Sequence, residues 1–177
     1  MSRRSSQLKV RSRRDPVRWE LCEHAAVKLW CEVWGGRAML APARENVDAF
    51  WTDGRLVIGT LEVKDHSFRR DGRNEEADHR KFTILPVRKY LAAVAFDALA
   101  VSSFLIVVLQ EQTLWEHVLE AQRLEIWKQP EDEALAGRLP EPAQVVAVYP
   151  LKAMHRLTNE PLFTERDPGG RTYVTPA

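Results

Sequence analysis

The chain has 177 residues, of which 45% are hydrophobic and 29% are charged, and its formal net charge is +1. This length and composition predict one globular domain and exclude a fibrous or largely disordered chain. No apolar run approaches the roughly 20 residues that a transmembrane helix needs, and no apolar segment follows the N-terminal charges as in a signal peptide. We therefore expect a cytoplasmic protein without a membrane partner.

The charges are unevenly distributed along the chain. The first 18 residues hold seven of the 26 basic residues but only one of the 25 acidic ones, so the remainder is acidic overall. A basic, serine-containing segment at residues 1–14 is typical of a disordered arm that contacts polyanions such as DNA, the alternative being a solvated tail. Its candidate nucleic-acid-binding residues are Arg3, Arg4, Lys9, Arg11, Arg13 and Arg14.

The ordered part of the chain is predicted to begin with a helix. Asp15 can cap this helix, and Pro16 suits the first helical position because its missing N–H is not needed there. The apolar residues that follow recur at helical spacing until Gly35 and Gly36, which end the helix. A short strand at residues 37–41 comes next.

Residues 46–65 are predicted to form two strands joined by a tight turn at Asp53-Gly54. The charged segment 65–81 is predicted to be a loop, and its Arg69 and Arg70 are further candidates for nucleic-acid binding. Helical spacing runs from residue 86 to 100, and the apolar run 104–109 is typical of a strand buried on both faces. The fold class is therefore α/β, with helices flanking a small mixed sheet.

The C-terminal third is predicted to pack on this core as a helix-strand-helix extension over residues 111–158. Thr113 and Glu116 have the spacing of a capping box, which predicts a helix from 114 to 128. A proline-containing acidic loop at 129–142 separates this helix from a strand at 144–149 and a short helix at 151–157. Proline, glycine and charge dominate residues 159–177, so we expect a flexible tail.

Two residues of the second hairpin strand stand out chemically. Glu62 and Lys64 are two apart and therefore project from the same face of the strand, at the end of an otherwise apolar run. In the order helix, three strands, helix, strand, this pattern resembles the PD-(D/E)xK nuclease superfamily, whose core is αβββαβ. The layout is most similar to archaeal-type Holliday junction resolvases. The matching positions are Glu23 on the first helix, Asp48, Glu62-Val63-Lys64, and Lys89 in a Val-Arg-Lys segment that opens the later helix.

The resemblance implies a restriction-endonuclease-like core at residues 15–110 that hydrolyses phosphodiester bonds with Mg²⁺ or Mn²⁺. Asp48, Glu62 and the Val63 carbonyl would be the metal ligands, because a hard cation prefers oxygen. Lys64 would orient the attacking water or stabilise the transition state. Glu23 would complete the shell, and Lys89 would face the site. Resolvase-like relatives act as symmetric dimers, so a homodimer is also expected.

The hairpin register decides whether Asp48 can join this site. With a two-residue Asp53-Gly54 turn and regular pairing, Asp48 would lie opposite Gly59 and on the other face from Glu62. One inserted residue reverses the face, and an isolated glycine inside a strand is a natural place for such a bulge. We therefore predict a bulge near Gly59 or an odd-length loop. In a regular hairpin, Glu45 would replace Asp48 as the candidate ligand.

Two hypotheses about function follow. The first is a metal-dependent endonuclease that acts on branched or otherwise structured DNA, as in repair or recombination. The second is a non-catalytic protein with the same fold, such as a nucleic-acid-binding or assembly subunit of a phage particle or larger complex. In the second case Glu62 and Lys64 are a structural ion pair.

Overall fold

The computed structural model describes residues 16–42, 45–66, 81–109, 111–127, 144–167 and 170–173. The predicted basic arm and the predicted loop arginines, Arg69 and Arg70, lie outside these residues. Of the helices in the described part of the chain, neither has the length and apolar character needed to cross a membrane.

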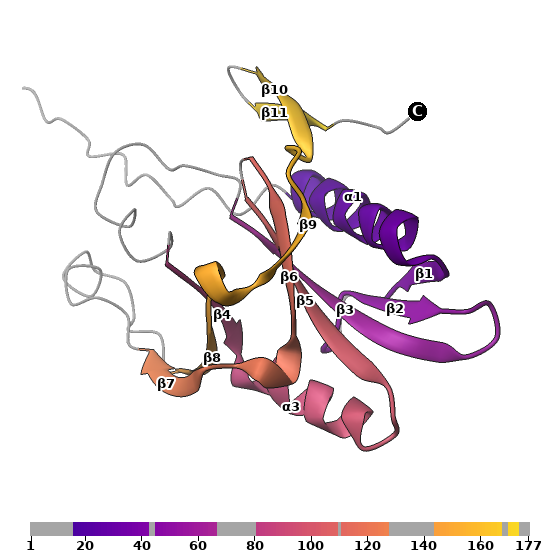
Figure 1. The fold of residues 1–177 in the computed structure, drawn as a ribbon, viewed down its shortest axis with the longest axis vertical. Helices are drawn as coiled ribbons and strands as arrows, with labels where there is room; N and C mark the ends of the chain where they lie inside the picture. Colours follow the sequence, from indigo (N-terminus) through magenta and orange to yellow (C-terminus); the bar gives the residue numbers. More distant parts are fainter. Residues whose placement is uncertain are drawn as a thin grey trace, which may run out of the picture.

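A six-stranded mixed sheet, sheet A, forms the centre of the molecule (Figure 1). Its strand order is β1-β2-β3-β5-β6-β9; only β3 and β5 are parallel, and every other neighbouring pair is antiparallel. The strands are β1 (Arg37–Leu40), β2 (Ala49–Thr52), β3 (Val57–Asp65), β5 (Ser102–Val108), β6 (Thr113–His117) and β9 (His155–Thr158). A parallel pair needs a long crossover, and the crossover between β3 and β5 carries the next two elements.

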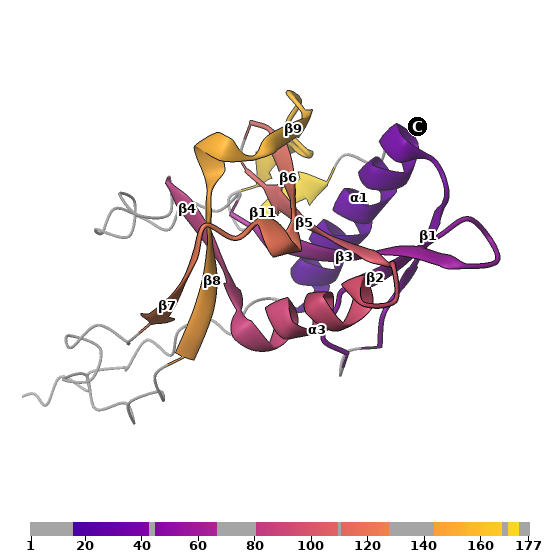
Figure 2. The same ribbon diagram turned by 60° about the horizontal axis from the view of Figure 1, so that its bottom comes forward.

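This crossover contains β4 (Phe82–Pro86) and helix α3 (Val87–Asp97). β4 lies outside sheet A, in a second, antiparallel sheet of order β4-β8-β7 (Figure 2). In this sheet β8 is Gln144–Pro150 and β7 is Arg123–Trp127. The short 3-10 turns η1 (Val118–Glu120) and η2 (Leu151–Ala153) connect the two sheets.

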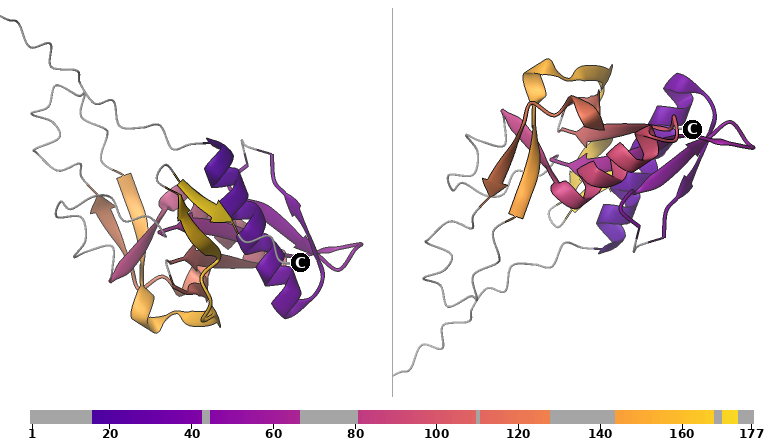
Figure 3. Two further views of the ribbon diagram at one scale, coloured as in Figure 1. Left: turned by 90° about the horizontal axis from the view of Figure 1, so that it is seen from above. Right: turned by 90° about the horizontal axis from the view of Figure 1, so that it is seen from below.

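Two hydrophobic cores lie on the two faces of sheet A. Helix α1 (Pro16–Trp34) covers one face, where Cys22, Ala26 and Trp30 pack against Leu61 and Val63 of β3. The other face is covered by α3 and the second sheet, and its core is built from Leu85, Ala93, Leu105, Val107, Ala147 and Tyr149. The views from above and below show α1 and α3 on these opposite sides (Figure 3). The structure thus confirms an α/β fold with a mixed sheet between helices.

The predicted C-terminal extension is wrong in its secondary structure. Of the helix predicted at 114–128, the described residues 114–127 form β6, η1 and β7 instead. Alternate residues of β6 enter opposite cores, Leu114 on the α3 side and Trp115 on the α1 side, which is the period of a strand. The buried Thr113 hydroxyl has no hydrogen-bond partner among the described residues, so it caps nothing. Pairing with β5 outweighs the local capping signal.

The other C-terminal elements agree with the predictions only in part. The strand predicted at 144–149 is β8, whereas the final helix is limited to η2 and is followed by β9. The expected tail contains two paired strands, β10 (Phe163–Asp167) and β11 (Gly170–Tyr173). The strand β4, at the end of the predicted loop, is a further element that the sequence does not predict.

The hairpin has the predicted bulge beside Gly59. Trp51 pairs with Gly59, but the next residue, Thr52, pairs with Val57, so β3 carries Ile58 as one extra residue. The predicted two-residue turn is wrong, since residues 53–56 connect the strands and Asp53 Oδ1 accepts hydrogen bonds from the Arg55 and Leu56 N–H groups. Without the extra residue, Asp48 would lie opposite Leu61 and point to the α1 side.

We expect Gly59→Ala to destabilise the protein by about 1 to 3 kcal/mol, because the new methyl group would overpack the α1-side core. A Cβ at this position would lie 2.9 Å from Trp51 Cε3 and 3.2 Å from both Phe104 Cε2 and the Ser102 carbonyl oxygen. Urea unfolding followed by tryptophan fluorescence measures the effect. The control is Val57→Ala across the bulge, where an exposed side chain predicts a change within about 0.5 kcal/mol. Equal stability of the two variants would contradict the close packing at Gly59.

Candidate active site

Glu62 and Lys64 lie on the α3 side of sheet A. Their neighbours in β3, Leu61 and Val63, point into the α1-side core, and alternate residues of a strand point to opposite faces. Because β3 is a central strand with both faces covered, Glu62 is only 4% exposed. A carboxylate buried this deeply must be paired, since an isolated buried charge costs several kcal/mol even after relaxation.

Asp48 is brought beside Glu62 by the register that the bulge creates. The Asp48 N–H donates to the Leu61 carbonyl at 3.0 Å. Because Ala49 pairs with Leu61, continuing the same register places Asp48 opposite Glu62. Asp48 Oδ2 accepts a hydrogen bond of 2.7 Å from the Val63 N–H. Since the N–H and C=O of one strand residue point to the same side, the Val63 carbonyl also faces the Asp48 side of β3.

Lys89, in the first turn of α3, joins the two carboxylates. Its Nζ donates to Asp48 Oδ1 at 2.9 Å and to Glu62 Oε1 and Oε2 at 2.6 and 2.5 Å. Lys64 Nζ lies 3.1 Å from Glu62 Oε1. Two acids and two lysines thus form a charge-balanced group, which we call the carboxylate–lysine cluster: Asp48, Glu62, Lys64 and Lys89.

The acids of the cluster are less exposed than the lysines. The side chains of Glu62 and Asp48 are 5% and 12% exposed, against 15% for Lys89 and 17% for Lys64. All four side chains of the cluster are nevertheless largely buried.

Burial and neighbouring charges shift the pKa values of Glu62 and Lys89. Burial raises the pKa of Glu62 above that of a free glutamate; Asp48 adds to this effect, while Lys64 and Lys89 oppose it without cancelling it. Burial alone would lower the pKa of Lys89, but the adjacent Glu62 and Asp48 carboxylates outweigh it and raise that pKa. Lys89 therefore keeps its proton and its positive charge between the two acids.

The structure brings together four of the five predicted catalytic residues. The fifth, Glu23, is half-buried on α1, which packs on the opposite face of sheet A from Glu62 and Lys64. Glu45, the alternative to Asp48, is exposed and lies earlier in the segment that leads into β2. The bulge thus selects Asp48.

Sequence reasoning missed the residues that β4 and β8 contribute near the cluster. His66 follows Lys64 in the same alternation, and its Nε2 lies 2.8 Å from the hydroxyl of Thr83 on β4, so this hydrogen bond joins the two sheets. The Tyr149 hydroxyl of β8 donates to the Val118 carbonyl at 2.6 Å, and burial, with Tyr90 and Glu62 nearby, raises its pKa. The run Phe82-Thr83-Ile84-Leu85, rich in aromatic and β-branched residues, is a sequence signal that could have identified β4.

A divalent cation is a chemically reasonable ligand of the cluster. The described residues contain no group of three or more Asp, Glu, His or Cys side chains arranged to hold a metal ion. Mg²⁺ does not require such a group, because proteins often bind it through one or two carboxylates, with water and substrate oxygens as the other ligands. Asp48 Oδ1, a Glu62 oxygen and the Val63 carbonyl match this donor set. One cation, the Lys89 ammonium, already contacts both acids, so the two carboxylates are close enough to share a cation.

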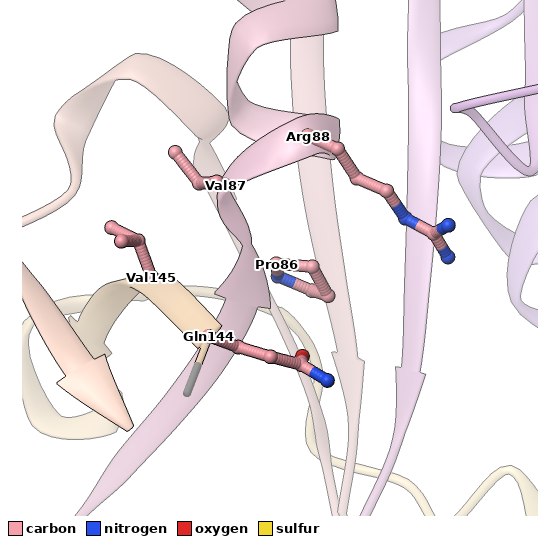
Figure 4. Close-up of a pocket in the computed structure, with 5 residues that line it drawn as sticks. All are labelled: Pro86, Val87, Arg88, Gln144 and Val145. Carbon is pink, nitrogen blue, oxygen red and sulfur yellow. The ribbon is translucent and has the colours of Figure 1, made fainter. Parts of the chain in front are cut away.

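A pocket of about 280 Å³ lies beside the cluster rather than at it. It is lined by the start of α3 and the start of β8 (Figure 4): Pro86, Val87, Arg88, Gln144 and Val145. Figure 4 shows the Arg88 side chain extending away from Val145.

No protein-family model, no curated protein and no solved structure matches this chain.

We predict that Asp48→Ala destabilises the protein by about 1 to 2 kcal/mol more than Asp48→Asn. The asparagine retains an oxygen that can accept from the Val63 N–H, whereas alanine leaves that buried donor without its 2.7 Å partner. Urea unfolding measures both variants, with Glu45→Ala as a control for removing an exposed acid from the same segment, expected to change stability by no more than about 0.5 kcal/mol. If alanine and asparagine are equally destabilising, the hydrogen bond with Val63 contributes nothing.

Proposed function

We propose that the protein is a metal-dependent endonuclease that hydrolyses phosphodiester bonds, in branched or otherwise structured DNA. The observation that carries this proposal is the convergence of Asp48 and Glu62 on a single cation, with Lys64 3.1 Å from Glu62. Two oxygen ligands and a lysine are the groups that phosphodiester hydrolysis requires, because the reaction generates negative charge on the phosphate and needs an activated water.

Each residue of the cluster has a distinct role in this proposal. Asp48, Glu62 and the Val63 carbonyl hold Mg²⁺ or Mn²⁺, which supplies Lewis-acid stabilisation and lowers the pKa of water. Lys64 orients the attacking water or donates to the phosphate oxygens as charge develops on them. The Val63 N–H fixes the orientation of the Asp48 carboxylate, so that its other oxygen faces the cluster.

The order of elements supports a restriction-endonuclease-like core. Helix α1, strands β1 to β3, helix α3 and strand β5 follow one another as in an αβββαβ core, and the acid-and-lysine pair lies on the third strand. The chain departs from that pattern at β4, which is inserted before α3 and belongs to the second sheet. A homodimer is part of the proposal on the resemblance to resolvases alone.

A second candidate function is a non-catalytic nucleic-acid-binding or assembly protein, such as a phage or complex subunit. The charge balance and the burial of the carboxylate–lysine cluster favour this function. Lys89 and Lys64 already neutralise both acids, and none of the four side chains is more than 17% exposed. In that case the cluster joins α3 to β3 and performs no chemistry.

The nuclease proposal predicts Mg²⁺- or Mn²⁺-dependent cleavage of at least one DNA among branched, flapped, single-stranded and linear duplex substrates. Glu62→Gln and Lys64→Met should each lower the cleavage rate at least about a hundredfold, as expected for loss of a ligand or of a charge-stabilising donor. Glu45→Gln is the matched control, because it neutralises an exposed acid near the hairpin, and it should cleave like the wild type.

Circular dichroism establishes that each variant is folded, and a chelator should abolish cleavage. If the wild type cleaves none of these substrates, or if Glu62→Gln and Lys64→Met cleave as fast as the control, the second candidate function replaces the first.

The proposed DNA partner gives a separate prediction for the basic arm. Deleting residues 2–14 removes Arg3, Arg4, Lys9, Arg11, Arg13 and Arg14. DNA binding should weaken, and the slope of log affinity against log salt should flatten by about 0.9 for each phosphate that the arm no longer neutralises. Fluorescence anisotropy at several salt concentrations measures both effects. A full-length variant with these six residues changed to Gln separates the effect of charge from the effect of length; affinity and slope equal to those of the wild type would exclude a role for the arm.

A further inference from the structure

Lys89 occupies the position between the two carboxylates that a metal ion would take. One nitrogen contacts three carboxylate oxygens, at 2.9, 2.6 and 2.5 Å, from Asp48 just before β2 and from Glu62 on β3. Lys64 Nζ, in contrast, lies 3.1 Å from one Glu62 oxygen. Of the two lysines in the cluster, Lys89 is therefore the one that bridges the acids.

This bridging has an electrostatic reason. Two carboxylates that lie side by side out of water repel one another, and one of them takes up a proton unless a cation lies between them. Lys89 supplies that cation from within the chain, so Asp48 and Glu62 are held in position without an added ion. An ammonium and a divalent ion that contact the same oxygens lie close enough to repel each other, so the two cations compete for these oxygens.

We propose that Lys89 is a tethered counter-ion that competes with the divalent metal for the Asp48 and Glu62 carboxylates, and that it must leave them before metal binds. This inference rests on the proposed metal-dependent function and adds a step at the same site. In this step, which we call the gate, the Lys89 ammonium moves away from the carboxylates. Part of the Lys89 side chain already reaches solvent, since it is 15% exposed. The long, flexible lysine stem allows the ammonium to move while α3 stays in place.

The gate makes metal affinity depend on a residue that is not a metal ligand. Removing the ammonium without shortening the side chain, as in Lys89→Met, should raise the affinity for Mn²⁺ and Mg²⁺ roughly ten- to a hundredfold, the equivalent of one or more charge-assisted hydrogen bonds that no longer compete. Lys89→Arg keeps a competing cation and should not raise it.

Isothermal titration calorimetry of the full chain with Mn²⁺ and Mg²⁺, without DNA, tests this inference. The controls Lys64→Met and Arg88→Met each remove one positive charge, from the other cluster lysine and from an exposed neighbour on α3. We expect a gain that is largest for Lys89→Met, smaller for Lys64→Met and absent for Arg88→Met. Affinity of Lys89→Met equal to or below that of the wild type overturns the proposal, as does an equal gain in Arg88→Met.

A second measurement covers a Lys89→Met variant that is too unstable for calorimetry. Without a metal the two acids lose their bridging cation, so its melting temperature should fall and should rise with Mn²⁺ more steeply than that of Lys64→Met. A melting temperature that does not respond to Mn²⁺ overturns the proposal.

The outcome is separable from that of the DNA cleavage assay. Cleavage by the wild type without a metal-affinity gain in Lys89→Met leaves the nuclease proposal standing and removes the gate. A metal-affinity gain in a protein that cleaves no DNA supports the gate and removes the nuclease.

Discussion

The charge balance around Glu62 is the interaction on which the centre of this molecule depends. A glutamate that is 4% exposed in a central strand is stable only if cations accompany it, and Lys64 and Lys89 are those cations. Because Lys89 belongs to α3 and Glu62 to β3, this electrostatic requirement also fixes the helix on the sheet. A buried pair of this kind adds little net stability compared with apolar packing, but removal of one partner is expensive.

The bulge at Ile58 is the backbone condition for that balance. It moves the β2–β3 register by one residue, so that Asp48 faces Glu62 and Lys89 rather than the aromatic core under α1. Gly59 permits the arrangement because Trp51 and Phe104 leave no room for a side chain there. The local backbone and the polar cluster are thus coupled, since a regular hairpin would bury Asp48 among apolar groups.

The sequence predicts the parts of the site that follow from local periodicity, and not the parts that follow from long-range pairing. Strand alternation alone places Glu62 beside Lys64, and the isolated Gly59 predicts the bulge. Lys89 is expected at the site only through the resemblance. The helix predicted from Thr113 and Glu116 is wrong because residues 113–117 form a hairpin with β5, and this pairing outweighs the capping-box signal. β4 is not predicted because its partner, β8, lies about 60 residues away in the sequence.

The two candidate functions differ in whether the lysine ammonium groups can move away from the two carboxylates. If the cluster is only structural, both ammonium groups stay bonded to the acids, and solvent access to the carboxylates plays no role. Here all four side chains are largely buried, with the lysines 15% and 17% exposed and the acids 5% and 12%. Displacing an ammonium on a flexible lysine stem does not require the backbone of α3 to move. In the proposed nuclease, the carboxylates would be reached by exchanging the Lys89 ammonium for a divalent cation.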